Sequence, residues 1–177
     1  TERGPVPQDV IQAVEFDAPT LNDDEVLLEL QASPINPSDV LTLTGLYGML
    51  PPLPAIGGNE GVGKVTQLGA DVEGFTVGQS VLLPVGIGTW STHIVAPAKK
   101  LSPLPPGADP QQLSMLSINP PTASLLLSEF VDLQEGDWVI QNAANSAVGN
   151  YLIQLAKSRG FKTINVVRRE SLIEPLM

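Results

Sequence analysis

A loop of small residues between an apolar strand and a helix is the feature that most constrains the fold of this chain. Trp138–Gln141 predicts a short apolar strand, and the residues that follow, Asn142–Gly149, are mostly small or are amides. Val148–Arg159 predicts a helix closed by Gly160, and Lys162–Val167 predicts a second strand. Strand, loop, helix and strand in this order form a βαβ unit.

Small residues in this loop are typical of a dinucleotide-binding fingerprint. The turn there must be tight, its backbone must approach a pyrophosphate closely, and the phosphate rests at the helix N-terminus. Gly149 is the one glycine of the loop, and Ala147 stands where a glycine is usual. Taken alone, the loop is explained equally well by a plain βαβ turn that binds nothing.

Two cations after the second strand indicate which dinucleotide would bind. In NAD sites an acidic residue about 20 residues after the fingerprint binds the ribose 2′-hydroxyl. Here Val167 is followed by Arg168 and Arg169. Because guanidinium groups bind phosphate through paired hydrogen bonds, this pair predicts the 2′-phosphate of NADP(H). The alternative is a solvated pair of charges at a strand end.

The N-terminal part of the chain predicts short strands. The chain has 16 glycines and 17 prolines, which suits many turns. Short strands with glycine and proline between them indicate a barrel-like β domain. The predicted strands are Val10–Phe16, Val26–Leu30, Gly61–Gly69, Val81–Pro84 and Thr89–Ala96.

The period of the apolar residues changes after Pro106. Asp109–Pro110 predicts a helix start. Asn119–Pro120 predicts a second one, whose helix carries Leu125, Leu126, Phe130 and Val131. The fold class is therefore α/β, or α+β overall. We expect a β domain over residues 1–108, connecting helices over 109–136, and the first βαβ of a Rossmann domain over 137–177, with the C-terminal half of that sheet absent.

Charge and composition exclude several classes of protein. Residues 1–137 carry 17 acidic and 4 basic residues, whereas residues 138–177 carry 2 acidic and 5 basic ones. The net charge of −10 argues against a nucleic-acid binder or an anionic-membrane binder. The excess of basic residues over acidic ones in residues 138–177 makes this C-terminal piece the better anion site. No cysteine and one histidine leave no disulfide scaffold and no thiolate zinc site.

Location is predicted from two further features. No apolar run approaches the roughly 20 residues that span a membrane, and no secretory or transit segment is visible. The cytoplasm is the expected location. The mitochondrial matrix is the alternative if a transit peptide precedes Thr1 and has been removed.

Six motifs, taken in order, carry a resemblance over nearly the whole chain. They are Ile35–Asp39, Gly45–Gly48, Leu53–Gly61, Asn119–Ala123, Val139–Ala143 with Asn145–Ser146, and Ile164–Arg168. With them the chain resembles the zinc-independent members of the medium-chain dehydrogenase/reductase superfamily. Within that superfamily it looks most like the mitochondrial-type trans-2-enoyl-CoA reductases, or 2-enoyl thioester reductases, and their bacterial relatives.

The resemblance implies a fold and an assembly. The family combines a GroES-like β-barrel domain, which C-terminal residues complete, with a Rossmann domain. This chain then contains most of the first and only the opening βαβ of the second. We therefore expect it to be a fragment that is inactive alone, and we expect a homodimer when the protein is complete.

The resemblance also implies an activity and a set of site residues. The family reduces the 2,3-double bond of enoyl-CoA or enoyl-ACP thioesters, with hydride passing from NADPH to the β-carbon. By this resemblance, Tyr47 matches the tyrosine that protonates the α-carbon. A phenol suits this role because it is protonated at neutral pH and can act as a general acid. Its alternative role is a loop anchor. The residues matched to the cofactor are Asn119, Asn145, Ser146, Ala147, Val148, Arg168 and Arg169; Asn119 would lie near the nicotinamide or serve as an N-cap.

Two other functions stay open. A zinc-independent NADPH quinone oxidoreductase uses the same cofactor domain, and a dinucleotide-binding fragment without catalysis is the alternative from another class. No metal is expected, because Asn59 stands where zinc-dependent relatives place the histidine of a Gly-His-Glu motif. Glu60 is then predicted to be a structural carboxylate rather than a ligand.

Overall fold

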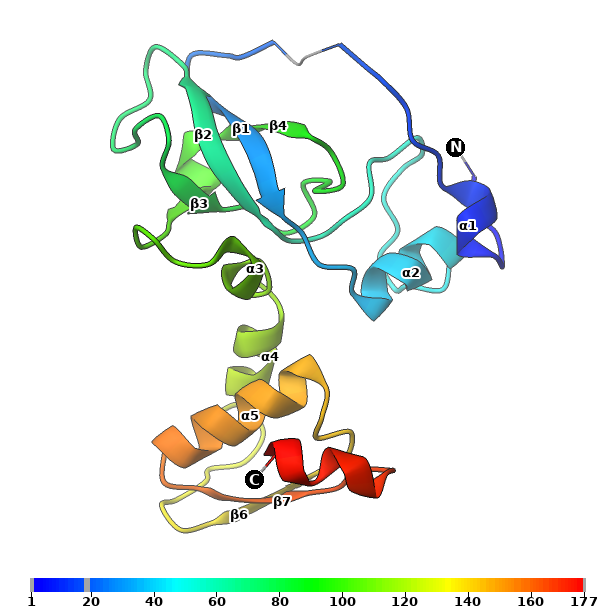
Figure 1. The fold of residues 1–177 in the computed structure, drawn as a ribbon, viewed down its shortest axis with the longest axis vertical. Helices are drawn as coiled ribbons and strands as arrows, with labels where there is room; N and C mark the ends of the chain where they lie inside the picture. Colours follow the sequence, from blue (N-terminus) through cyan, green and yellow to red (C-terminus); the bar gives the residue numbers. More distant parts are fainter. Residues whose placement is uncertain (1, 18–19, 177) are drawn as a thin grey trace. The chain divides into compact units, whose positions relative to one another are not determined.

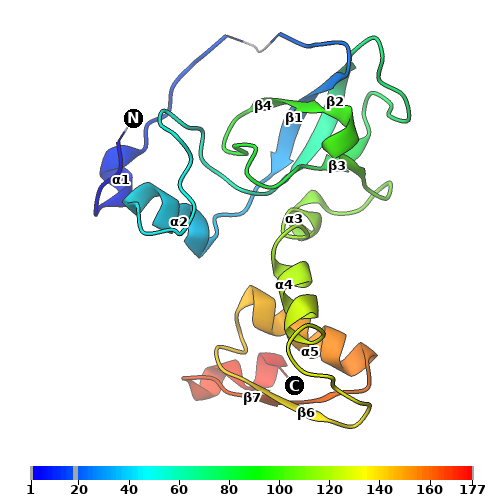
Figure 2. The ribbon, with the colours of Figure 1, turned by 180° about the vertical axis from the view of Figure 1, so that it is seen from behind.

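The computed structural model describes residues 2–17 and 20–176. It contains two compact units, Thr1–Ser117 and Ile118–Met177, which Figures 1 and 2 show from opposite sides. The division after Ser117 falls within the segment predicted to connect two domains. The three-part division at residues 108 and 136 stays a prediction.

The first unit is built on one antiparallel sheet. Its strands are hydrogen-bonded in the order β4-β1-β2-β3-β5. They are β1 (Glu25–Ala32), β2 (Val62–Leu68), β3 (Ser80–Leu82), β4 (His93–Pro97) and β5 (Ser102–Pro103). The strands predicted at Val26–Leu30, Gly61–Gly69 and Val81–Pro84 are confirmed in place, while the one predicted from Thr89 begins only at His93.

Alternating apolar residues explain why this sheet forms. Val26 and Leu28 are two residues apart on β1, so they point to the same face, and both are fully buried. They pack with Val65 on β2 and Val81 on β3. This face of the sheet is the core of the first unit.

Two expectations for the first unit are wrong. Within the described residues the sheet is open, because β4 and β5 are its two edges and do not pair with each other, so no barrel closes. Val10–Phe16 forms no strand. Val10 ends the short helix α1 (Pro7–Val10), and Val14 and Phe16 are exposed. A strand needs a hydrogen-bonded neighbour, and no strand of the sheet pairs with this segment.

Two further short helices lie in the first unit. They are α2 (Pro37–Thr44) and α3 (Pro110–Leu113), each with proline in its first turn, as the sequence predicts. The Asp109 side chain accepts a hydrogen bond from the Gln111 backbone N–H at 2.9 Å and so caps α3. A 3-10 turn, η1 (Ala98–Lys100), joins β4 to β5.

The second unit contains the predicted βαβ unit. Strands β6 (Trp138–Gln141) and β7 (Lys162–Asn165) pair in parallel, and α5 (Ala147–Ser158) connects them. Helix α4 (Asn119–Leu126) lies beside α5 (Figure 1). The core between them contains the buried residues Ala123, Leu127, Leu152 and Ala156. Two 3-10 turns, η2 (Glu170–Leu172) and η3 (Glu174–Leu176), follow β7.

One face of the β6–β7 pair is covered and the other is not. Val139 packs against the α4–α5 core, whereas Trp138 and Ile140 on the alternate positions are 62% and 70% exposed. Parallel sheets are normally covered on both faces. In the described part of the second unit, helices therefore cover one face of the sheet and leave the other face exposed.

Two elements of this unit are shorter than the sequence predicts. Helix α4 ends at Leu126, so Phe130 and Val131 lie outside it and are exposed. Strand β7 ends at Asn165, opposite Gln141, because β6 itself ends there. The chain then leaves the ladder after one more hydrogen bond, from the Val166 N–H to the Gln141 carbonyl at 2.9 Å.

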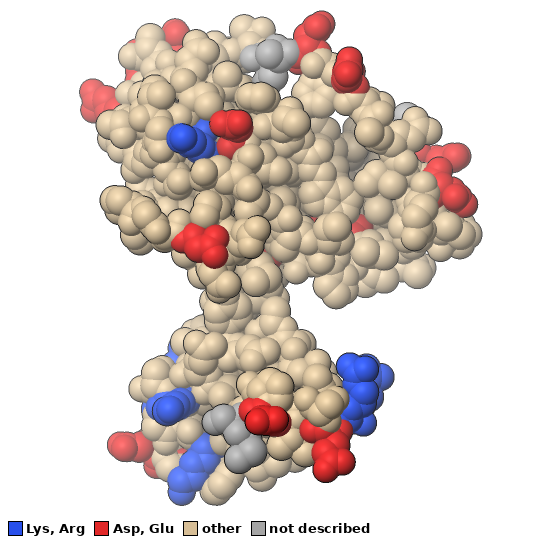
Figure 3. Space-filling view, viewed as in Figure 1, with Lys and Arg blue, Asp and Glu red and all other residues tan. Residues whose placement is uncertain are grey.

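The two units differ in charge, as the sequence indicates. In the view of Figure 3, acidic side chains are scattered over the first unit, and most of the visible lysines and arginines belong to the second. No helix among residues 2–17 and 20–176 is long and apolar enough to span a membrane.

Candidate nucleotide-binding site and the Tyr47 loop

The turn after β6 is tight, as the fingerprint requires. Ala143 adopts a left-handed backbone conformation with φ of +48°, which is unusual for a residue with a Cβ atom. The Ser146 N–H then bonds the Ala143 carbonyl at 2.9 Å, and the Ala144 N–H bonds the Val166 carbonyl at 3.3 Å. The loop is thereby held against the segment that leaves β7.

Gly149 lets α5 approach this loop. A Cβ atom at Gly149 would lie 2.5 Å from the backbone oxygen of Ala144, too close for any side chain. The Gln141 side chain links β6 to both α5 and β7. Its Nε2 donates to the Gly149 carbonyl at 3.2 Å and to the Asn165 Oδ1 at 2.7 Å. From the sequence, Gly149 is expected where the helix packs closely on the sheet, but its close contact is with the loop backbone at Ala144.

Ser146 caps the N-terminus of α5. Its Oγ accepts a hydrogen bond from the Gly149 N–H at 3.1 Å, a contact that typically contributes about 1 kcal/mol to helix stability. The other N–H groups of the first turn have no partner within the helix. This helix end therefore favours an anion.

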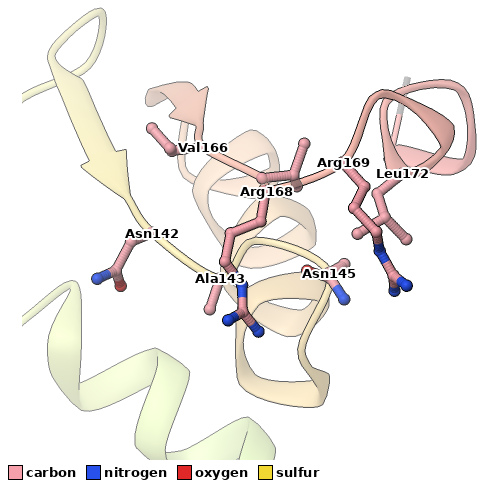
Figure 4. A pocket seen from close by; sticks show the side chains of 8 residues that line it. Asn142, Ala143, Asn145, Val166, Arg168, Arg169 and Leu172 are labelled. Carbon is pink, nitrogen blue, oxygen red and sulfur yellow. The ribbon is translucent and has the colours of Figure 1, made fainter.

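A cavity of about 710 Å³ opens between this loop and the segment after β7. Arg168 and Arg169 both line it, together with Asn145 from the loop. Figure 4 shows both arginine side chains extending from the segment after Val166 toward the side where Asn145 lies. Both arginines are exposed, so a phosphate can reach their guanidinium groups.

The structure brings together three of the predicted cofactor residues, Asn145, Arg168 and Arg169. Ser146 is the N-cap of α5, Ala147 and Val148 are its first two residues, and none of the three is among the residues that line the cavity. The loop prediction did not single out Asn142 and Ala143, and it missed Leu172 in η2 altogether, although all three line the cavity. Membership of the loop was a signal for the first two; nothing in the sequence pointed to Leu172.

Asn119 is the first residue of α4, because Ile118 occupies the N-cap position. Asn119 is buried, and its Nδ2 has no hydrogen-bond partner among the described residues. A buried amide donor without a partner is costly. It is a group that a bound ligand could satisfy, so its assignment to the cofactor stays a prediction.

Tyr47 lies in the loop that follows α2. The helix ends at Gly45, which has φ of +78°, and the Leu46 and Tyr47 N–H groups both bond the Leu41 carbonyl, at 2.9 and 3.2 Å. The Tyr47 side chain is 38% exposed. Its backbone is thus tied to the helix while its side chain can meet a substrate.

A second, mostly apolar cavity of about 390 Å³ lies in the first unit. It is lined by the N-terminal segment, by Leu53–Gly57 of the loop beyond Tyr47, and by Trp90–Thr92. Tyr47 is not among its lining residues.

Asn59 and Glu60, at which no zinc is expected, are each hydrogen-bonded to other residues. Asn59 Nδ2 donates to the Asp39 Oδ1 at 2.6 Å. Glu60 is fully buried and accepts hydrogen bonds from the Asn36 Nδ2 at 2.9 Å and the Ser117 N–H at 3.1 Å. In the part of the chain that the structure describes, no group of three or more histidine, cysteine or acidic side chains could hold a metal ion.

Comparison with known proteins places this arrangement in a family. Residues 22–106 match the alcohol dehydrogenase GroES-like domain. Over 171 residues the chain is 43% identical to the mitochondrial enoyl-[acyl-carrier-protein] reductase of Rattus norvegicus, a match that covers 96% of this chain and 46% of that protein. The chain belongs to the medium-chain dehydrogenase/reductase superfamily. It spans about half the length of the curated relatives it matches.

Solved structures of the superfamily superpose on the chain. The Etr1p/NADP/crotonyl-CoA complex, Etr1p being a Candida tropicalis protein, is 33% identical with a TM-score of 0.86, and covers 98% of this chain and 54% of that one. The Escherichia coli quinone oxidoreductase complexed with NADPH is 28% identical with a TM-score of 0.84, and covers 98% and 53%.

The GroES-like match contains the Tyr47 loop and the Asn59–Asp39 hydrogen bond. It begins just before β1 and ends just after β5, so it takes in the whole open sheet. The loop 142–149 and both arginines lie outside it, in the βαβ unit of the second compact unit. The expected GroES-like domain followed by a βαβ unit is therefore confirmed.

Proposed function

We propose that the full-length protein is an NADPH-dependent oxidoreductase that reduces the 2,3-double bond of enoyl thioesters. One observation carries the cofactor part of this proposal. Two arginines and the fingerprint loop line a single cavity next to a capped helix N-terminus. An acidic residue at the place of Arg168 or Arg169 would instead favour NAD.

The residues of the second unit fit NADP(H) by their chemistry. The N–H groups at the start of α5 suit the pyrophosphate, and Arg168 and Arg169 suit the 2′-phosphate. Asn119 has a buried amide donor for a ligand. When bound, NADPH supplies a hydride from C4 of its nicotinamide. Solved relatives that hold NADP or NADPH support this choice.

Tyr47 is proposed as the proton donor to the α-carbon of the thioester. Its phenol is partly exposed on a loop anchored to α2, so it can donate a hydrogen bond outward. The name of the rat relative and the crotonyl-CoA bound to Etr1p support a thioester substrate.

A quinone oxidoreductase is the second candidate. The similarity to the Escherichia coli enzyme favours it, since that protein also binds NADPH. A third possibility, a dinucleotide-binding protein without catalysis, follows if the full-length protein oxidises NADPH with neither substrate.

One assay separates these candidates. We expect full-length protein to oxidise NADPH with a 2-enoyl thioester and to show negligible NADPH oxidation with a quinone. The consumption of NADPH is measured by its absorbance, with a saturated thioester as the control that offers no double bond. Rapid quinone reduction together with an inert enoyl thioester would reverse the order of the two candidates.

The protein is expected to work without zinc. Asn59 and Glu60 are already hydrogen-bonded to Asp39, Asn36 and Ser117, and an amide is a poor zinc ligand. Elemental analysis of the purified protein should find no stoichiometric zinc, and a chelator should change neither turnover nor melting temperature. About one zinc ion per chain would contradict the assignment of Asn59.

For location and assembly we propose the mitochondrial matrix and a homodimer. The mitochondrial names of the curated relatives support the matrix over the cytoplasm. The Etr1p/Etr2p heterodimer of Candida tropicalis supports a two-subunit assembly. A small thioester is the proposed partner, with no nucleic acid and no membrane.

A further inference from the structure

A partly buried polar cluster lies at the N-terminus of α2. We define it as Asn36, Asp39, Asn59 and Glu60. Both oxygens of the Asp39 carboxylate accept hydrogen bonds, Oδ2 from the Asn36 N–H at 2.7 Å and Oδ1 from the Asn59 Nδ2 at 2.6 Å. The Asn36 side chain continues the cluster by donating to Glu60 at 2.9 Å.

Asp39 is the single residue of α2 that is buried, at 3% exposure. Among the apolar residues of this helix, Val40 and Leu41 are 38% and 39% exposed, and Leu43 is half-buried. A helix is normally oriented by burial of an apolar face. In α2 the buried side chain is a carboxylate, so we expect its hydrogen bonds to orient the helix.

The opposite end of α2 carries Tyr47. The Leu41 carbonyl accepts hydrogen bonds from the N–H groups of both Leu46 and Tyr47. The helix of eight residues is about 12 Å long. Because a helix is stiff over this length, a tilt at its N-terminus displaces the loop at its C-terminus.

A second support for α2 exists but is weaker. The Gly4 N–H donates to the Leu43 carbonyl at 3.3 Å, and the short helix α1 lies beside α2. Neither contact buries a side chain of α2.

We infer that the Asp39–Asn59 hydrogen bond positions Tyr47 through α2. This inference rests on the proposed function, in which Tyr47 donates the proton. Asp39 and Asn59 are positioning residues: they set where the phenol lies and do not touch the substrate. A displacement of about 1 Å in a reacting group can cost about a hundredfold in rate.

The test is a double-mutant cycle in the full-length protein. Asn59→Ala removes the donor to Asp39, and we expect kcat per folded molecule to fall at least about tenfold, with NADPH affinity unchanged. In a Tyr47→Phe background the same substitution should lower kcat by less than about twofold, because the group it positions is already gone. Equal losses in both backgrounds would overturn the inference and leave Asn59 with a structural role only.

Two further variants keep the result interpretable. Asn59→Asp preserves the shape but places a carboxylate against Asp39, so kcat should again fall, and it serves if Asn59→Ala folds poorly. Thr66→Val removes a hydrogen bond of 3.0 Å from an exposed side chain to the Leu27 carbonyl elsewhere in the sheet, and should leave kcat per folded molecule unchanged.

The outcomes also separate this inference from the proposed function. If Tyr47→Phe alone leaves kcat unchanged, the proton-donor role fails and the inference fails with it. If Tyr47→Phe lowers kcat but Asn59→Ala and Asn59→Asp both keep native turnover per folded molecule, only the inference fails.

Discussion

Tyr47→Phe in the full-length protein should lower turnover of a 2-enoyl thioester by about 10²–10⁴-fold, the usual loss when a positioned general acid is removed. The loss should appear equally in kcat and kcat/KM, because the proton moves only in the chemical step. NADPH affinity should be unchanged, since the fingerprint loop and both arginines lie in the other compact unit. Steady-state kinetics and NADPH titration measure these quantities.

The chain offers a matched control for this variant. Tyr151 is its other tyrosine, lies in α5 and packs against the second core, so Tyr151→Phe should keep turnover within about twofold. A Tyr47→Phe enzyme with a raised KM and an intact kcat would make Tyr47 a substrate-positioning residue. Unchanged kinetics would reduce it to a loop anchor. If the protein is a quinone reductase, quinone turnover should be insensitive to Tyr47.

Replacement of both Arg168 and Arg169 by alanine should remove most of the preference for NADPH over NADH. Charge-assisted hydrogen bonds contribute about 1.5–3 kcal/mol each, and a tenfold preference requires about 1.4 kcal/mol. Both side chains are exposed and therefore partly screened. We expect a preference of at least tenfold in the unmodified protein, measured as the ratio of the two dissociation constants.

The same measurement contains its controls. Lys157→Ala removes an exposed cation from α5, in the same unit, but Lys157 does not line the cavity. It should leave the ratio unchanged. NADH affinity should survive the double substitution, because NADH has no 2′-phosphate. The preference should also weaken as ionic strength rises. Equal affinities for NADPH and NADH in the unmodified protein would contradict the role given to the two arginines.

The fold was predicted best where local pattern and tertiary packing coincide. The βαβ unit appears where expected, because an apolar strand, a small-residue loop, an amphipathic helix and a C-terminal glycine all favour the same local structure. The alternating Val26 and Leu28 likewise suffice for β1. Val10–Phe16 failed because its pattern is that of a strand, but a strand exists only with a neighbour to pair with. No local pattern indicated that β4 and β5 would be left unpaired with each other within the described residues.

Some residues of the candidate site could likewise be predicted from local sequence, and others could not. Arg168 and Arg169 were predicted from their spacing after the loop, and both line the cavity, because the length of the helix between two parallel strands decides where the second strand ends. Leu172 could not be found, because it reaches the cavity through a 3-10 turn with no distinctive pattern. Ala143 was not expected in a left-handed conformation, which local sequence disfavours and the surrounding hydrogen bonds impose.

The amino-acid sequence by itself determined the residue types at each proposed site position: small residues at the tight turn, cations after β7, a phenol after α2, and an amide in place of a histidine at Asn59. Those choices depend on neighbours within one loop or one helix. Only the tertiary structure decided that Asn59 bonds Asp39, 20 residues away, and that this pair anchors the helix bearing Tyr47. Hydrogen bonds between distant segments depend on how the chain packs, and no local pattern encodes that.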